Sequence, residues 1–405
     1  MVAVNRDSAE ARCKRDTGVL GECDAVDILD RMVDRAVLMG ASDIHIEPKW
    51  DMVRVRFRID GYLVEQPSIQ TEIAQQVVSR IKVLARMDIS ERRLPQDGQF
   101  KLETGSSSLI NLRAATFPCT QGEKVVLRLL LGQNLIAFDR LGLADDHQRR
   151  IRLLVRQPRG FIVTCGPTGS GKTSTLYALL RLIDTSKMNV LTLEDPIEVE
   201  LYSITQGQTN ARHGITFAAG LRAALRQDPD IILVGEIRDA ETSAIALQAA
   251  LTGHLVLSTL HTSDAVETIV RLVDLGVEPW IIANALSCVV AQRLVRAVCS
   301  ECKDTVPLDA DMWDGDELIL REGTMVVRPR GCAKCNWTGY FGRTGIFQVL
   351  EIDDDLRLLI KAKASASEYR TLLRARKVAS LRRSGYLKIM SGETTVDEIM
   401  RVTPG

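Results

Sequence analysis

The octapeptide at residues 166–173 constrains this chain more than any other feature. It reads Gly-Pro-Thr-Gly-Ser-Gly-Lys-Thr and fits the pattern G-x-x-x-x-G-K-[ST] in full. Residues 161–164 before it predict a buried strand, and residues 172–184 predict a helix after it. Glycines let backbone N–H groups close around phosphate oxygens, the lysine reaches the β- and γ-phosphates, and the final hydroxyl holds Mg²⁺. We therefore predict a nucleotide site made by Gly166, Pro167, Thr168, Gly169, Ser170, Gly171, Lys172 and Thr173.

The length and charge of the chain limit its class. With 405 residues it exceeds what a single core usually holds, so two or more domains are expected. Lys+Arg and Asp+Glu both number 52, which gives no overall positive field of the type that drives nonspecific nucleic-acid binding. The longest apolar run, Ile281–Val290, is interrupted by Asn284 and Ser287 and predicts no membrane span, and the first residues show no signal sequence. We expect a cytosolic protein with reduced thiols.

The periodicity of apolar residues predicts two domains of different type. Residues 1–23 are expected to be a flexible lead-in, followed by an N-terminal α+β domain over 24–132 and a linker over 133–143. From residue 144 to 405 short apolar strands alternate with longer helices, which is typical of a mostly parallel sheet. The elements expected in the first domain are a helix from Val26 to Val37 capped by Asp24, a strand over Val53–Ile59, a hairpin turn at Asp60-Gly61, a helix over Ile73–Ala85, and strands over Leu109–Ala115 and Lys124–Leu131.

Acidic residues follow two more predicted strands. The strand 230–234 leads to Glu236, and the strand 190–193 leads to Glu194. A phosphate-loop enzyme needs an acid that orders Mg²⁺ and water, and a carboxylate base for the attacking water. The sequence alone ranks Glu194 and Glu236 equally as that base. His261 lies just past an apolar strand, where it either senses the γ-phosphate or is a structural histidine, and the pattern leaves both open.

Two C-x-x-C pairs, Cys299/Cys302 and Cys332/Cys335, predict a metal site. Four thiolates complete the tetrahedral coordination of Zn²⁺, so the site would be closed and structural, within an insertion over residues 299–335. We expect the acid-rich stretch around Asp309–Glu322 to be a loop whose base the metal holds. The cysteines without metal spacing are Cys13, Cys23, Cys119, Cys165 and Cys288.

At this point the chain resembles the assembly ATPases of type II secretion and type IV pili. Leu193–Glu198 is similar to the aspartate box of that family, Leu225–Asp239 to its Walker B region, and Thr252–Ala265 to its histidine box. In the first domain, Ala41–Pro48 and Arg93–Gly98 resemble the family's second N-terminal domain.

The resemblance implies an α/β fold, with a RecA-like P-loop NTPase domain, a smaller N-terminal α+β domain and a tetracysteine zinc insertion. It implies ATP hydrolysis with Mg²⁺ and structural Zn²⁺, with Glu194 as general base, Glu236 as Walker B acid and His261 as histidine-box residue. Arg113 and Arg128 would act as arginine fingers, because a fixed cation stabilises charge that develops in phosphoryl transfer. Three further arginines would contribute around the site, namely Arg222, Arg226 and Arg238.

The resemblance also implies partners and a location. A homo-hexamer at the cytoplasmic face of the bacterial inner membrane would power assembly of a type II secretion pseudopilus or a type IV pilus through an inner-membrane platform protein. Larger members carry a further N-terminal domain that docks onto a membrane protein, whereas only residues 1–23 precede the first domain here, so this partner stays open. The zinc insertion is typical of secretion and pilus extension members rather than of retraction members.

Two alternatives from other classes are weighed against this interpretation. A DNA-translocating or RecA-type ATPase would share the second domain, but zero net charge and 4% aromatic residues argue against a nucleic-acid partner. A non-hydrolysing nucleotide-binding scaffold is disfavoured because Lys172, Thr173, Glu194 and Glu236 are all present.

Overall fold

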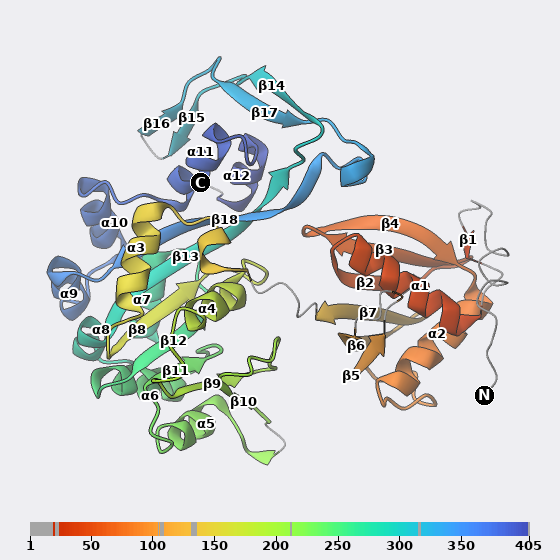
Figure 1. The fold of residues 1–405 in the computed structure, drawn as a ribbon, viewed down its shortest axis with the longest axis horizontal. Helices are drawn as coiled ribbons and strands as arrows, with labels where there is room; N and C mark the ends of the chain where they lie inside the picture. The colour runs from red at the N-terminus through yellow and green to blue at the C-terminus, as the bar shows by residue number, and fades with distance from the viewer. Residues whose placement is uncertain are drawn as a thin grey trace. The chain divides into compact units, whose positions relative to one another are not determined.

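The computed structural model describes residues 19–20, 24–103, 105, 109–130, 136–210, 213–314 and 317–403. The chain forms two compact units, Met1–Asn134 and Leu135–Gly405 (Figure 1). Each unit has a sheet and a core of its own, and each is described by itself. Within these described ranges, no helix is both long and apolar enough to cross a membrane.

The first unit is built on one sheet with two helices, α1 (Ala25–Leu38) and α2 (Thr71–Leu84). Its strands are β1 (Val19–Leu20), β2 (Ala41–Pro48), β3 (Val53–Ile59), β4 (Tyr62–Ile69), β5 (Gln96–Glu103), β6 (Leu109–Cys119) and β7 (Gly122–Leu130). They lie in the order β1-β4-β3-β2-β7-β6-β5. Strand β1 pairs with β4 and falls inside the predicted lead-in, so regular structure begins before Asp24. The remainder of residues 1–23 lies outside the described part of the chain.

Local sequence explains the first elements. The side chain of Asp24 accepts hydrogen bonds from the N–H groups of Val26 and Asp27 at 2.8 Å, which confirms the predicted cap of α1. Strand β3 has its predicted bounds. In the hairpin after it, Asp60 and Gly61 have φ values of 48° and 90°, the left-handed pair that a tight two-residue turn requires. Helix α2 begins two residues before its predicted start at Ile73.

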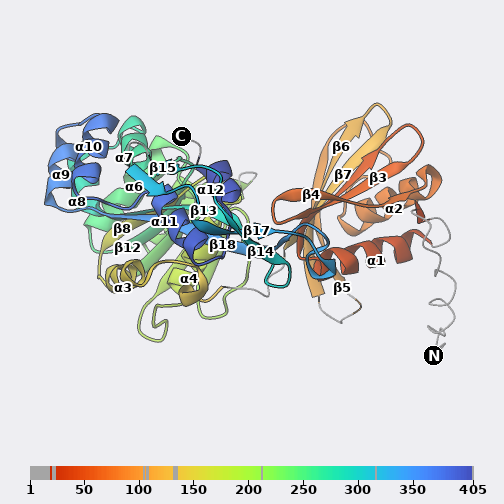
Figure 2. The same ribbon diagram turned by 90° about the horizontal axis from the view of Figure 1, so that it is seen from above.

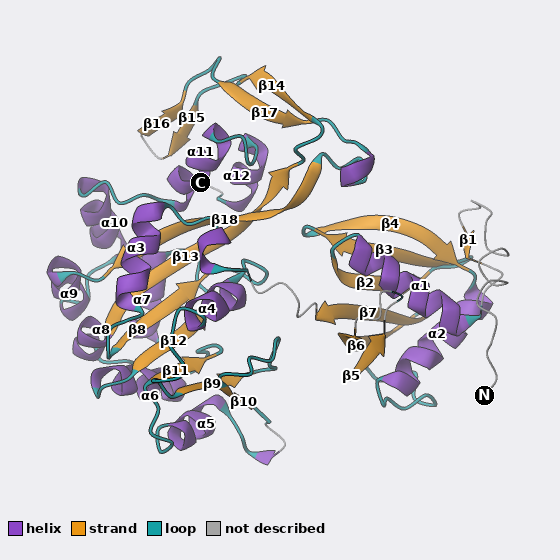
Figure 3. Ribbon diagram, viewed as in Figure 1, coloured by secondary structure: helices purple, strands orange, loops and turns teal. Residues whose placement is uncertain are grey.

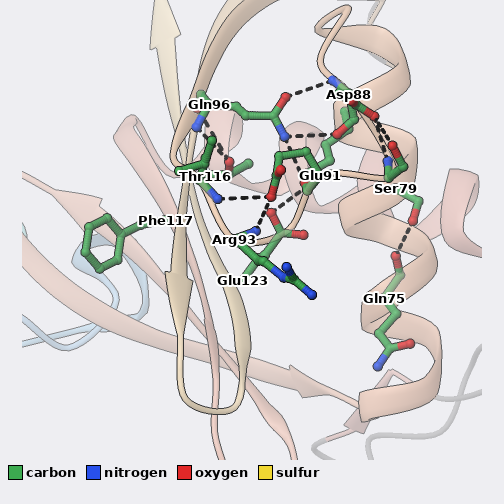
Figure 4. A network of polar contacts seen from close by, with 12 residues as sticks. Gln75, Ser79, Asp88, Glu91, Arg93, Gln96, Thr116, Phe117 and Glu123 are labelled. Carbon is green, nitrogen blue, oxygen red and sulfur yellow. Dashed lines mark hydrogen bonds and ion pairs between the residues drawn. The ribbon is translucent and has the colours of Figure 1, made fainter.

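Two residues of the Arg-Leu-Pro-Gln-Asp-Gly motif fix the connection from α2 to β5. The side-chain amide of Gln96 donates to the carbonyl oxygens of Asp88 at 2.9 Å and Glu91 at 3.0 Å, and its oxygen accepts from the N–H of Asp88 at 2.8 Å (Figure 4). A Cβ at Gly98 would lie 2.3 Å from the carbonyl oxygen of Ala85. This part of the motif therefore has a structural role within the first unit.

The second unit contains a seven-stranded sheet in the order β10-β9-β11-β12-β8-β13-β18 (Figure 1). All neighbours are parallel except β13 and β18, which confirms the predicted mostly parallel sheet. The strands are β8 (Gly160–Cys165), β9 (Val190–Glu194), β10 (Thr205–Gln208), β11 (Ile231–Val234), β12 (Leu255–Leu260), β13 (Leu286–Val298) and β18 (Tyr340–Glu351). The helices are η2 (Phe138–Arg140), α3 (Asp145–Leu154), α4 (Lys172–Leu180), α5 (Phe217–Ala224), α6 (Ala240–Leu251), α7 (Ala265–Asp274), α8 (Pro279–Ala285), α9 (Asp354–Lys361) and α10 (Ala366–Ala375).

Helices cover both faces of this sheet, as buried parallel strands require. Helices α3 and α4 share one apolar core with one face, and α5 to α10 share another core with the opposite face (Figure 2). Phe138 and Leu141 of the predicted linker 133–143 are buried in the first of these cores. The linker is therefore packed onto the second unit over its described residues.

Two predictions for this unit are wrong. The helix expected over residues 172–184 ends at Leu180, because the N–H groups of Leu182 and Ile183 bond three residues back and tighten the last turn. The stretch expected to be a loop around residues 309–322 instead holds short antiparallel strands (Figure 3). These are β15 (Met312–Asp314) and β16 (Glu317–Leu320). A second antiparallel pair, β14 (Lys303–Pro307) and β17 (Met325–Pro329), flanks them, and both pairs pack near α11 (Leu381–Met390) and α12 (Val396–Val402).

Candidate nucleotide-binding site

The predicted phosphate loop joins the end of β8 to the start of α4. Gly166, Gly169 and Gly171 have φ values of 152°, 79° and 87°, a region that other residues rarely adopt. A Cβ at Gly166 would lie 2.5 Å from Oγ of Ser170 and 2.6 Å from the carbonyl oxygen of Gln292. The glycines therefore allow the backbone to close on itself, with its N–H groups available around the start of α4.

Lys172 lies over this loop. Its Nζ donates to the carbonyl oxygens of Gly166 at 2.8 Å and Pro167 at 3.0 Å. Burial lowers the pKa of Lys172, while the charge of Glu236 acts in the opposite direction. The ammonium group is thus held at the loop by neutral carbonyls, in the place where phosphate oxygens would meet it.

The parallel register brings the predicted acids to the same edge of the sheet. Val234 of β11 is the partner of Leu193 in β9, and Leu260 of β12 is the partner of Cys165 in β8. The residues that follow these strands, among them Glu236 and His261, therefore emerge at the carboxyl edge together with the phosphate loop. This is the edge where ligands bind in open α/β sheets.

Glu236 is surrounded by charged groups. It forms an ion pair with Arg238, Nε2 of His261 lies 3.4 Å from its Oε2, and its side chain is 13% exposed. Contact with Glu236 raises the pKa of Arg238. Burial and the charge of Lys172 lower the pKa of His261, and Glu236 only partly compensates. The structure therefore brings Glu236, His261, Arg238 and Lys172 together.

Glu194 has a different environment. It is 3% exposed, and its carboxylate accepts hydrogen bonds from neutral side chains alone among the described contacts. Thr192 donates to Oε1 at 2.6 Å, Gln206 donates to the same oxygen at 3.0 Å, and the hydroxyl of Tyr177 donates to Oε2. Burial raises the pKa of Tyr177, and the neighbouring carboxylate raises it further. Tyr177 therefore remains a donor at neutral pH.

The other predicted arginines make contacts elsewhere. Nη2 of Arg222 pairs with Glu241 at 2.5 Å, and Nη1 of Arg226 donates to the carbonyl oxygen of Arg222 at 2.9 Å, so both stay at α5 and α6. Arg113 and Arg128 belong to the first unit, where they are cross-strand partners on β6 and β7. Their roles at the nucleotide stay predictions.

The side chain of Asp43 anchors Arg128 within the first unit. Nε of Arg128 donates to Oδ1 of Asp43 at 2.9 Å. Asp43 and Arg128 are also cross-strand partners, and Asp43 is buried. The predicted motif Ala41–Pro48 therefore supplies the carboxylate that orients Arg128.

Sequence reasoning missed four residues of this site. Nε2 of Gln292 donates to the carbonyl oxygen of Ser170 at 2.8 Å and so supports the phosphate loop from β13. Tyr177, Thr192 and Gln206 hold Glu194. One signal was available for Tyr177, since a tyrosine on a buried helix needs a partner for its hydroxyl.

The four predicted metal ligands do come together. The sulfurs of Cys299, Cys302, Cys332 and Cys335 all lie within 4.8 Å of one another. Three of their separations are 3.8, 3.7 and 3.8 Å, far longer than a disulfide bond. Four sulfurs bound at about 2.3 Å to one Zn²⁺ would lie about 3.8 Å apart, so the cluster fits the ion.

Backbone donors further suit the cluster to a metal. The N–H groups of Cys332 and Gly339 point at the sulfur of Cys335, each at 3.2 Å. Burial acts to raise the pKa of Cys335, but these donors outweigh it and hold the pKa at about 6. Of the thiols without metal spacing, Cys165 and Cys288 are buried and Cys119 is exposed, whereas Cys13 and Cys23 lie outside the described residues.

The fold and the site define the class. A parallel sheet with a phosphate loop between β8 and α4, and helices on both faces, is the architecture of a RecA-like P-loop NTPase. Residues 21–401 match the family described as "Type II/IV secretion system protein", and the chain belongs to that family.

Individual relatives agree with this assignment. Type II secretion system protein E of Dickeya dadantii is 46% identical over 387 residues, which cover 95% of this chain and 77% of the relative. Type IV pilus assembly ATPase TfpB of Acinetobacter baylyi is 42% identical, over 94% of this chain and 65% of the relative. The solved structure of the Legionella pneumophila ATPase DotB shares the fold, with a TM-score of 0.70 at 24% identity, over 95% of this chain and 99% of that chain.

Proposed function

We propose that this protein hydrolyses ATP and uses the energy to drive assembly of a type II secretion pseudopilus or a type IV pilus. The observation that supports the proposal is that Lys172 lies at the phosphate loop near Glu236, while Glu194 ends β9 at the same edge of the sheet. Membership of the secretion family supports the cellular role. Both named systems have relatives of this chain, so the proposal covers both.

The phosphate loop would bind the nucleotide. Backbone N–H groups of residues 168–173 and the ammonium of Lys172 would surround the phosphates, and the start of α4 would add its positive end. Thr173 would hold Mg²⁺, which neutralises charge on the phosphates when bound. Gln292 keeps the loop in shape through Ser170.

The two glutamates would divide the chemistry. Glu194 would take a proton from the attacking water, since its neutral surroundings hold no cation that competes for the carboxylate. Glu236, among Arg238, His261 and Lys172, would order the water and the ion rather than act as the base.

Arginines would complete the site when subunits assemble. We propose a homo-hexamer in which Arg113 and Arg128 of the α+β domain, over residues 24–132, reach the nucleotide bound by the domain over residues 144–405. Arg222 and Arg226 would contribute from α5. Hydrolysis would move the two domains relative to each other, and this movement would be the mechanical work. Asp43 would release or orient Arg128 during that movement.

The tetracysteine cluster would hold structural Zn²⁺. Four ligands fill the coordination of the ion, so the site leaves no position for a substrate. Bound Zn²⁺ would fix the base of β14 and β17 to the ends of β13 and β18.

The work would pass to an inner-membrane platform protein, with the hexamer at the cytoplasmic face of that membrane and, as a further candidate, a membrane docking protein beside it. We expect no nucleic-acid partner, because the formal net charge is zero. DNA-stimulated hydrolysis would instead favour the DNA-translocating alternative.

The test is the rate of ATP hydrolysis per subunit as a function of protein concentration, with size followed by light scattering. The rate should rise as hexamers form, and Lys172→Ala should abolish it at every concentration. A concentration-independent rate from a monomer would sink the shared-site ring, and an inactive confirmed hexamer would favour the scaffold alternative.

A further inference from the structure

The carboxylate of Glu194 is fixed from three different elements. Thr192 lies two residues before it on β9, Gln206 lies on the neighbouring strand β10, and Tyr177 lies on α4. Gln206 is itself held, because its oxygen accepts from the N–H of Leu201 at 2.6 Å and its nitrogen donates to the carbonyl of Val199 at 3.0 Å. We call Tyr177, Thr192 and Gln206 the Glu194 donor set.

The donor set treats the two carboxylate oxygens differently. Each oxygen of an ionised carboxylate offers about two acceptor positions. Oε1 accepts from both Thr192 and Gln206, so its positions are filled, whereas Oε2 accepts from Tyr177 alone among the described contacts. One acceptor position therefore remains, and it belongs to Oε2.

We propose that Tyr177 is the positioning residue for the general base, and that Oε2 of Glu194 is the atom that receives the proton of the attacking water. The proposal rests on the proposed role of Glu194. In the step, one O–H bond of water breaks and its proton goes to Oε2. The water oxygen bonds to the γ-phosphorus, and the bond from that phosphorus to the bridging oxygen breaks to release ADP.

Tyr177 connects this base to the nucleotide loop. Residues four apart on a helix lie on the same face, so Tyr177 is one turn beyond Thr173, and α4 begins at Lys172. The helix that presents the phosphate-binding residues therefore also carries the donor that orients the base. A nucleotide that moves the start of α4 would move the hydroxyl of Tyr177 with it.

Tyr177→Phe tests the proposal, because it removes the hydroxyl and keeps the buried ring. Loss of one hydrogen bond to a charged group corresponds to about one to two pH units, so the acidic limb of the kcat–pH profile should move to higher pH by that amount. At neutral pH kcat should fall about 10- to 100-fold, with KM for ATP within about twofold. The charged groups at this edge, Lys172, Asp195 and Glu236, are left in place.

Tyr369→Phe is the matched control. Tyr369 is another buried tyrosine of the same unit, on α10, and it belongs to the apolar core on the opposite face of the sheet from Tyr177. It should leave the pH profile and kcat unchanged. Thr192→Val removes one donor to Oε1 and preserves the shape of the side chain. It should shift the acidic limb in the same direction by a smaller amount, and it is the test variant if Tyr177→Phe fails to fold.

Glu194→Gln distinguishes the positioning role of Tyr177 from the proposed role of Glu194 as general base, on which it rests. If Glu194→Gln retains the wild-type rate, Glu194 is not the base and both proposals are wrong. If Glu194→Gln is inactive while Tyr177→Phe, or Thr192→Val in its place, keeps the wild-type kcat and pH profile, only the positioning role is wrong. A fall in kcat with an unmoved pH profile would also overturn it, since a purely structural defect predicts that result.

Discussion

Glu194 and Glu236 are the same residue type at the ends of neighbouring parallel strands, yet their surroundings differ in kind. Neutral hydroxyl and amide donors hold Glu194, which is 3% exposed. An arginine and a histidine hold Glu236, with a lysine close enough for its pKa to feel the carboxylate. Partner chemistry, rather than position along a strand, distinguishes the two acids.

The difference bears directly on mechanism. A carboxylate already paired with cations gives up part of that interaction when it takes a proton, whereas one held by neutral donors does not lose an ion pair. A carboxylate that cations keep ionised can still accept hydrogen bonds from the water bound to Mg²⁺. This difference supports our proposal that Glu194 is the base and Glu236 the acid that orders the metal ion.

The largest expected effect is on chemistry at Glu194. Glu194→Gln should lower kcat about 1000-fold, because loss of a general base typically removes that much of the rate. The Mg²⁺ concentration for half-maximal rate should not change. Steady-state hydrolysis over a Mg²⁺ titration measures both, and a raised Mg²⁺ requirement would reverse the roles of the two acids.

A third glutamate, Glu398, is buried but lies outside the nucleotide site, so its substitution tests the effect of burial on stability alone. Glu398 is 1% exposed and pairs with Arg296 at 2.7 Å and Arg401 at 2.7 Å. Glu398→Gln leaves two cations without their counter-charge and should destabilise the second unit by about 3 kcal/mol, while KM for ATP stays unchanged. Urea unfolding followed by tryptophan fluorescence measures this. Glu351→Gln, in a more exposed pair with Arg150, should cost less than about 1 kcal/mol.

The same carboxyl group gives a pH dependence of stability. Burial acts to raise the pKa of Glu398, but Arg401 and Arg296 outweigh it and hold the pKa at about 2, below the ordinary 4.5. Its contribution is complete above pH 4.5 and is lost as the pH falls toward 2. Wild type and Glu398→Gln should therefore converge in stability over that window, and parallel curves would contradict the assignment.

Glu236→Gln should have an intermediate effect. We expect kcat to fall about 30-fold and the half-maximal Mg²⁺ concentration to rise about 10-fold, since one ligand to the hydrated ion is weakened. The comparison with Glu194→Gln is made in one Mg²⁺ titration. A larger fall in kcat than for Glu194→Gln, with no change in Mg²⁺ dependence, would make Glu236 the base.

The smallest expected effect concerns His261. Burial and Lys172 lower its pKa below 6.5, so the ring is neutral at pH 7.5 and gains a charge beside Glu236 only on acidification. Activity should fall between pH 7.5 and 5.5 in both proteins, and the fold loss should be about two- to threefold smaller for His261→Gln than for wild type. Identical pH profiles for the two proteins would show that the charge of His261 does not influence hydrolysis.

Much of the site was accessible from the sequence because its chemistry is local. The phosphate loop, the strand before it and the acids after two apolar strands lie within short segments whose periodicity is visible. The paired cysteines predicted their cluster because two-residue spacing has few other uses.

The donor set and the insertion strands could not be predicted in the same way. Gln206 reaches Glu194 only because β10 pairs with β9, with Gln206 opposite Thr192, and no local pattern fixes that register. Strands β14 and β17 likewise pair across most of the insertion, from Lys303 opposite Pro329 to Val306 opposite Val326. Their short segments carry too few residues for a clear alternation.

Strand β13 gives the second unit a mechanical property. Gln292 on this strand touches the phosphate loop, and Cys299 follows its last residue, seven residues and roughly 23 Å further along an extended chain. A paired strand is stiff along its axis, so β13 connects the phosphate loop mechanically to the cysteine cluster. The pairing of β13 with β18 shifts register between Arg296 and Val298, so the connection contains one irregular point, one to three residues before Cys299, where the strand can bend.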